Sequence, residues 1–254
     1  MQQPTTTDTR NIVISYLTLR KLLGGLGIML PVVLFAGSLC MGQAIEGSIS
    51  AYYYTAMRDL FVGLLCAMAL FLFCYKGYDD PDVRISESTL ANFAGAMALL
   101  VALFPTSKDL DQECIGCVAN LLGWYQYCAF SLLTVVHLGS AVLFFTIVAY
   151  LSVSRFTKIT PPEGRESEIR LYRICGYVIY ISLAIMVIYF ALCETLFKNN
   201  DWFLNLPVIF VFETTSLWAF GIAWLRKGKA MDDVKSAGRF IRQTFKKKTK
   251  LSDL

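Results

Sequence analysis

The sequence predicts an all-α, polytopic membrane protein with six transmembrane helices and with both termini in the cytoplasm. Two observations predict it: long apolar stretches carry almost no charge, and lysines and arginines concentrate on alternate connections between them. Of the 254 residues, 56% are hydrophobic and 17% are charged, whereas soluble domains have about 45–50% apolar and about 25% charged residues. Within lipid each backbone polar group needs a partner in its own segment, so the spanning stretches are expected to be helices.

A transmembrane helix needs about 20 apolar residues to cross a hydrocarbon core of roughly 30 Å. Six stretches come close to that length: Leu22–Met41, Ala56–Tyr75, Leu90–Phe104, Cys128–Leu151, Ile174–Leu196 and Phe203–Leu225. The first is too long for a typical signal peptide, and Leu39 is large where a cleavage site requires a small residue, so we expect it to stay uncleaved. Before the fifth stretch, the charged run Glu163–Arg170 is expected to extend the helix.

The third stretch, Leu90–Phe104, is the shortest of the six. Its small residues recur four positions apart, as Ala91 with Gly95 and as Ala94, Ala98 and Ala102. This spacing lets helix backbones approach closely in lipid. We therefore expect the third helix to lie inside the bundle, where a short apolar length is tolerable.

The basic residues predict the orientation. All but three of the 23 lysines and arginines lie before the first stretch, in the second and fourth connections, or after the last stretch. The exceptions are Arg58, Lys108 and Lys198. Because positive residues are retained on the cytoplasmic side, both ends are expected there. The predicted organisation is a cytoplasmic segment at 1–21, a six-helix transmembrane domain at 22–226 and a basic amphipathic cytoplasmic tail at 227–254.

The predicted tail places apolar residues near helical spacing, with basic residues beside them. Such a segment can lie on anionic lipids of the inner leaflet, at about 1 kcal/mol for each basic residue close to the surface. The same charges also suit an ordinary positive-inside tail, and the sequence leaves both interpretations open.

Two ionisable side chains are expected deep in the membrane. Residues of this kind are costly there and normally face the bundle interior or a wet cavity, which makes them functional candidates. Glu213 is about ten residues into the sixth stretch, close to mid-membrane, and His137, the only histidine, is about ten residues into the fourth. For Glu213 we expect a ligand counter-charge or a proton relay, with a structural hydrogen bond between helices as the alternative. For His137, a packing role and a relay or catalytic role both remain.

A second group of polar residues gathers on the extracytoplasmic side, where Arg58 and Asp59 open the second stretch and Glu194 lies near the end of the fifth. A planar guanidinium suits bidentate recognition of a phosphate or carboxylate, so Arg58 is a candidate ligand contact. The alternative is a plain helix start, with Thr55 as the cap and Asp59 favoured by the helix dipole. The expected ligand-binding set is Ser48, Ser50, Tyr53, Arg58, Asp59, His137, Glu194 and Glu213.

The composition excludes several kinds of chemistry. A single histidine cannot build a multi-histidine zinc site or a bis-histidine haem site, and we expect no metal and no cofactor. Walker, Rossmann and Gly-x-Ser-x-Gly motifs do not occur, which leaves nucleotide use and that class of hydrolase without support. No nucleic-acid partner is expected. Cys114 and Cys117 lie in a predicted extracytoplasmic connection, where they can form a disulfide or stay reduced.

Three runs resemble recurring stretches of an uncharacterised family of bacterial six-span membrane proteins: Gly47-Ser48-Ile49-Ser50-Ala51-Tyr52-Tyr53-Tyr54-Thr55 with Arg58 and Phe61-Val62-Gly63, then Lys76-Gly77-Tyr78-Asp79, then Ala102-Leu103-Phe104-Pro105-Thr106. More distantly, the layout resembles the DRAM/Frag/Sfk membrane proteins, in which a Ser-Ile-Ser-like turn lies between the first two spans. The resemblance implies an integral protein of the bacterial inner (plasma) membrane with a role in lipid handling or stress. It supplies no catalytic residue.

The leading hypothesis is a protein that binds a lipid headgroup or small amphiphile in a polar pocket open to the extracytoplasmic side, with membrane lipids as its partners. Arg58 would engage an anionic group at the mouth, and Glu213 and His137 would form a deeper polar floor. One alternative is a lipid-modifying membrane enzyme with His137 or Glu213 as general base, for which the sequence identifies neither a nucleophile nor an oxyanion partner. Another is a small transporter or channel with Glu213 in the path, which a homo-oligomer could form between subunits.

Overall fold

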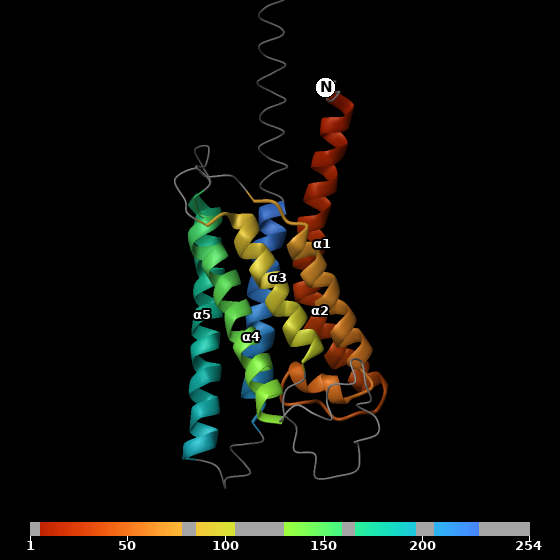
Figure 1. The fold of residues 1–254 in the computed structure, drawn as a ribbon, viewed down its shortest axis with the longest axis vertical. Coiled ribbons are helices and arrows are strands. Elements are labelled where there is room, and N and C mark those ends of the chain that lie inside the picture. Colours follow the sequence, from red (N-terminus) through yellow and green to blue (C-terminus); the bar gives the residue numbers. More distant parts are fainter. Residues whose placement is uncertain (1–5, 78–84, 105–129, 159–165, 197–205, 229–254) are drawn as a thin grey trace, which may run out of the picture.

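The computed structural model describes residues 6–77, 85–104, 130–158, 166–196 and 206–228. Within these ranges all regular structure is helical, and no strand occurs. The long helices lie side by side in one bundle, and the first extends beyond the others at its N-terminal end (Figure 1). In chain order the elements are α1 (Thr6–Cys40), the 3-10 helix η1 (Ser50–Tyr54), α2 (Arg58–Phe73), α3 (Glu87–Leu103), α4 (Phe130–Tyr150), the π-helical turn η3 (Leu151–Arg155), α5 (Glu166–Thr195) and a last helix, Val208–Gly228.

A helix lies at each of the six apolar stretches. Most ends lie within a few residues of the predicted ones, but α1 begins at Thr6 rather than Leu22, and α5 begins at Glu166 rather than Ile174. Among the described residues, four helices are long and apolar enough to cross a membrane: Leu17–Cys40, Thr134–Arg155, Glu166–Cys193 and Val208–Gly228. The other two are shorter, with 16 residues in α2 and 17 in α3. At 1.5 Å per residue these two helices are about 24–26 Å long.

The small residues of α3 form its buried face, as the sequence predicts. Ala91, Ala94, Gly95, Ala98 and Ala102 are all buried, and α3 packs between α2 and α4 (Figure 1). A Cβ added at Gly95 would lie 3.0 Å from the carbonyl oxygen of Ala69 in α2. The missing side chains therefore bring the α2 and α3 backbones close together, which is how helices gain contact where lipid gives no hydrophobic drive.

The last helix packs against α1 through a pair of glycines, Gly24 and Gly221. A Cβ added at Gly24 would lie 2.7 Å from the carbonyl oxygen of Gly221, and one added at Gly221 would lie 2.6 Å from that of Gly24. The indole Nε1 of Trp218 also donates to the carbonyl oxygen of Ile28, at 3.2 Å. These contacts join the two ends of the described chain, although nearly 200 residues separate Gly24 from Gly221.

The charged run before the fifth stretch is helical from Glu166 onward, which confirms the predicted extension over its described part. Its acidic side chain Glu168 accepts from Arg226 at 2.8 Å and links α5 to the last helix. The predicted cap of α2 is wrong, because the helix begins at Arg58 and Met57 occupies the capping position. The Thr55 hydroxyl instead accepts from the Met57 amide, at 3.1 Å, and so stabilises the turn before the helix.

Several predictions fall outside the described residues. These are the Cys114–Cys117 connection, the basic tail from residue 229 onward and the first five residues of the cytoplasmic segment.

The glycine contact between α1 and the last helix predicts a sharp difference between neighbouring positions. Gly24→Ala is expected to destabilise the bundle by about 1–3 kcal/mol, because the new methyl group overlaps backbone atoms of the last helix. Gly25→Ala is the control, since a Cβ there meets nothing within 4 Å, and its better helix propensity should leave stability unchanged or raise it by up to about 1 kcal/mol. Unfolding by SDS titration from detergent micelles measures both. Equal effects at the two positions would contradict the packing described.

Candidate functional site

The polar site begins with the way the chain leaves α1. Gly42 has φ +65°, and the amides of Gly42 and Gln43 donate to the carbonyl oxygens of Leu39 and Ser38, at 3.1 and 2.9 Å. This is the Schellman arrangement, which needs a left-handed residue at the position of Gly42 and reverses the chain direction at a helix end. The connection then crosses the end of the bundle, and this end is called the η1 end below (Figure 1).

The connection is held there by the first turns of the last helix. The Phe210 amide, one of the donors that a helix N-terminus leaves free, donates to the carbonyl oxygen of Gly47 at 2.9 Å. Ser48 accepts from the Ala51 amide at 3.1 Å and so closes the first turn of η1. The Glu213 carboxylate accepts from the Ile49 amide at 2.5 Å and lies 3.4 Å from the Ser50 hydroxyl.

The sequence suggests that Glu213 lies near the middle of its helix, but in the structure it is the sixth residue of that helix. The helix begins at Val208, directly after Pro207, and Leu206 before the proline does not belong to it. Proline has no amide hydrogen and disfavours helix in the residue that precedes it, so it often marks a helix start. The carboxylate therefore lies close to the η1 end, where its shortest hydrogen bond is the one that it accepts from the Ile49 amide.

His137 is linked to the same place from α4. Its Nε2 lies 2.9 Å from the Ser50 hydroxyl oxygen, and its Nδ1 lies 2.6 Å from the carbonyl oxygen of Phe104. Phe104 is the residue after α3 and has extended backbone angles, as expected of a residue that precedes a proline. A carbonyl only accepts, so Nδ1 carries the hydrogen and Nε2 of the neutral ring is an acceptor. The single hydrogen of the Ser50 hydroxyl therefore faces two acceptors, Nε2 at 2.9 Å and the more distant Glu213 carboxylate at 3.4 Å.

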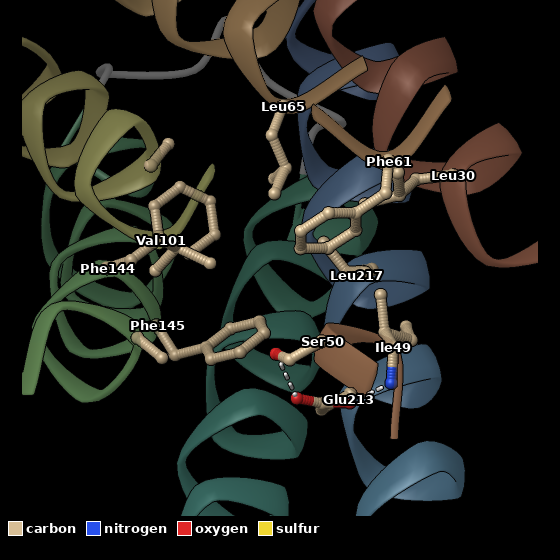
Figure 2. Close-up of a pocket in the computed structure, with 12 residues that line it drawn as sticks. Leu30, Ile49, Ser50, Phe61, Leu65, Val101, Phe144, Phe145, Glu213 and Leu217 are labelled. Carbon is tan, nitrogen blue, oxygen red and sulfur yellow. Dashed lines mark hydrogen bonds between the residues drawn. The ribbon is translucent and has the colours of Figure 1, made fainter. Parts of the chain in front are cut away.

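Ser50 and Glu213 also line a cavity in the bundle, with about 40 Å³ open to the centres of water molecules. Figure 2 shows the serine hydroxyl and the carboxylate at one end and hydrocarbon side chains around the rest. The lining residues are Leu30, Ile49, Ser50, Phe61, Leu65, Ala98, Val101, Ala141, Phe144, Phe145, Glu213 and Leu217. Because one water needs only about 10–15 Å³ on this measure, the space holds a few waters or a narrow apolar group.

Of the remaining predicted residues, Tyr53, Arg58 and Asp59 do not line this cavity. The Arg58 guanidinium is 4.8 Å from the centre of the Tyr53 ring, and its Nη2 donates to the Tyr53 hydroxyl at 3.3 Å. Asp59 is exposed in the first turn of α2. Glu194 lies in the last turn of α5, and its side chain is outside the described part of the structure. The structure thus brings together Ser50, His137 and Glu213, and it pairs Arg58 with Tyr53 elsewhere.

A second polar cluster, missed by the sequence analysis, lies at the opposite end of the bundle. The Lys227 ammonium donates to the Glu87 carboxylate at 2.8 Å, and the Tyr75 hydroxyl donates to the same oxygen at 2.7 Å. The two charged side chains are 1% and 7% exposed, and the ammonium lies 3.7 Å from the centre of the Phe156 ring. The sequence counts Lys227 only as a cytoplasmic charge, because its partner is 140 residues away.

Among the residues that the structure describes, no group of three or more histidine, cysteine, aspartate or glutamate side chains could hold a metal ion. Comparison of the chain with protein-family models, with curated proteins and with solved structures finds no match. The functional assignment below therefore depends on the two polar clusters and the cavity.

The buried Glu87–Lys227 pair predicts a strong dependence of stability on both charges. Lys227→Met is expected to cost about 3–5 kcal/mol, because the Glu87 carboxylate stays buried without that cation. The double variant Glu87→Gln with Lys227→Met removes both charges and should lose less than either single variant. Arg226→Met is the control: Arg226 is 40% exposed in its pair with Glu168, and such a pair contributes about 1 kcal/mol or less. Additive losses in SDS unfolding would contradict the pairing.

Proposed function

We propose that the chain is a six-span membrane protein with both termini in the cytoplasm, and that the η1 end faces the extracytoplasmic side. The distribution of basic residues supports this orientation. Of the lysines and arginines that the structure describes, Arg58 alone belongs to the η1 end, whereas Arg20, Arg155 and Lys227 lie at or near the other end. The short helices α2 and α3 are tolerable spans because they pack against neighbours inside the bundle.

Cysteine labelling in intact cells tests this orientation. In a variant without the eight native cysteines, Ala44→Cys lies in the exposed η1-end connection and Lys158→Cys lies exposed after η3. A membrane-impermeant maleimide is expected to label Ala44→Cys in intact cells and Lys158→Cys only after permeabilisation, because lysines and arginines are retained inside. Labelling of Lys158→Cys in intact cells would reverse the proposed topology.

The proposed function is binding of a small amphiphile from the surrounding membrane. The cavity carries this proposal, because it combines a long apolar wall with one polar end at Ser50 and Glu213. An apolar pocket with a few convergent polar groups is the usual form of a small-molecule site. The hydrocarbon part of the ligand would fill the apolar space, and its polar head would bond with the serine and the carboxylate.

The dimensions and charges of the cavity narrow the choice of ligand. Its open volume of about 40 Å³ suits a single chain end or a small head better than a complete phospholipid headgroup. A carboxylate at the polar end favours a head that donates hydrogen bonds or carries positive charge. Arg58 lies against Tyr53 and does not line the cavity, so we assign it to the rim, where it would meet an anionic neighbour of the ligand.

A transport role finds less support in this arrangement. The polar residues of the η1 end and the Glu87–Lys227 pair belong to opposite ends of the bundle, and between them the described interior is largely apolar. Leu30, Leu65, Met68 and Phe220 are among the buried side chains of that interior. An ion crossing it would lose its hydration without gaining a replacement. Binding is therefore the function that the geometry favours.

Filling the cavity tests the proposal. Ala141→Phe places a ring where the ligand would lie, whereas Val142→Phe, at the next residue of α4, adds the same ring at a position that is 38% exposed outside the core. Native mass spectrometry of protein extracted gently from membranes should show one retained amphiphile in the wild type and in Val142→Phe, and none in Ala141→Phe. A bare wild-type protein, or equal retention by both variants, would contradict the proposed site.

A further inference from the structure

We propose that Ser50 is the nucleophile of an acyl-transfer site, with His137 as its general base and an ester of a single-chain lipid as the acyl donor. This inference rests on the proposed binding of an amphiphile in the cavity, and it names the chemical class of that amphiphile. It also supplies the nucleophile that an enzyme at this site would need. The inference depends on the hydrogen bonds of Ser50, on the orientation of His137 and on access from the cavity.

The first observation is the pairing of nucleophile and base. A serine hydroxyl is a weak nucleophile until a neighbouring base accepts its proton, and activated pairs are about 2.6–3.2 Å apart. The Ser50 Oγ and His137 Nε2 are separated by 2.9 Å, and both side chains are buried, at 8% and 1% exposed. The hydrogen bond between Ser50 and His137 is therefore shielded from bulk water, which would weaken it by competing for the same donor and acceptor.

The second observation is that a third group orients the base. The Phe104 carbonyl accepts from His137 Nδ1 at 2.6 Å, so the lone pair of Nε2 points at the serine. This carbonyl is available because α3 ends at Leu103 and Phe104, which precedes a proline, has extended backbone angles that take its carbonyl out of the helical ladder. A general base needs the tautomer whose lone pair faces the nucleophile, and the Phe104 carbonyl fixes that tautomer here.

The third observation is access to an apolar chain. Ser50 lines the cavity, while Phe61, Leu65, Phe144 and Phe145 form its apolar wall (Figure 2). A fatty-acyl chain lying along that wall would bring its carbonyl carbon to the polar end. Glu213 holds the serine in place, because its carboxylate accepts from the amide of the preceding residue, Ile49. His137 is not among the lining residues, but its Nε2 lies 2.9 Å from the Ser50 oxygen, so the departing and entering oxygens would meet it beside Ser50.

The reaction needs only the ester and an acceptor hydroxyl. The Ser50 oxygen attacks the ester carbonyl carbon while its proton passes to His137 Nε2. The carbon–oxygen bond to the alcohol breaks, and the imidazolium returns the proton to the departing alkoxide. An acceptor hydroxyl, from water or from a second alcohol, then gives its proton to His137 and attacks the acyl-serine. Ser50 recovers its proton, and the acyl group leaves on the acceptor.

Covalent labelling tests the proposal directly. The purified full-length protein is treated in detergent with an alkyl fluorophosphonate, which serine nucleophiles attack at phosphorus with loss of fluoride. Peptide mass spectrometry is expected to place the adduct on Ser50, and an excess of a single-chain fatty-acid ester should slow the labelling by competition. Ser182→Ala is the matched control, because Ser182 is also a buried serine of the bundle, at 2% exposed, but lies in α5 and does not line the cavity. It should label at the wild-type rate.

His137→Gln should label at least about 100-fold more slowly, the lower end of the usual contribution of a general base. An equal rate in that variant overturns the role of His137. Wild-type protein that retains an amphiphile in native mass spectrometry but takes no label at Ser50 overturns the acyl-transfer proposal and leaves the binding function intact. Bare, unlabelled protein overturns both. The competition experiment needs no variant, so a substitution that fails to fold does not prevent the test.

Discussion

The hydrogen bond from the Ile49 amide to the Glu213 carboxylate determines how the η1 end of the molecule is assembled. It ties the connection between α1 and α2 to the last helix, across 164 residues of sequence. Ser50 follows Ile49 directly, so the same bond places its hydroxyl beside His137 of α4 and at the end of the cavity. In an apolar interior a buried amide or carboxylate without a partner costs several kcal/mol. The pairing therefore stabilises the fold and sets the geometry of the site together.

Close packing elsewhere makes this arrangement rigid. Small side chains on α3 bring it close to its neighbours, and Gly24 and Gly221 bring α1 against the last helix. The lining of the cavity combines small residues, Ala98 and Ala141, with larger ones such as Leu65 and Phe145, and the small side chains leave room within this packing. A space of this kind costs dispersion contacts that a tighter interior would make. Because the cavity lies beside a serine, a histidine and a carboxylate, we interpret it as a ligand site.

Buried polar groups find their partners in different ways at the two ends of the bundle. At the Lys227 end, opposite charges meet directly, and aromatic rings of Tyr75 and Phe156 enclose the ammonium. At the η1 end, a neutral chain of hydrogen bonds runs from the Phe104 carbonyl through His137 to Ser50, and the Glu213 carboxylate lies beside its end. The first arrangement encloses an ion pair among aromatic rings. The second ends at the Ser50 hydroxyl, which lines the cavity, and this difference is why the proposed function is placed at the η1 end.

The sequence by itself determined the approximate positions of the helices and which face of α3 is buried, because hydropathy and small-residue spacing are properties of local windows. It also identified Ser50, His137 and Glu213 as candidate site residues, because polar side chains in or beside apolar stretches are visible in the sequence. Its set of eight residues also contained Arg58 and Asp59, which only the tertiary structure separates from the cavity. The depth of Glu213 depended on the true start of its helix at Val208, and the Glu87–Lys227 pair on packing across 140 residues. Contacts between distant residues follow from how the helices pack, which no local pattern encodes.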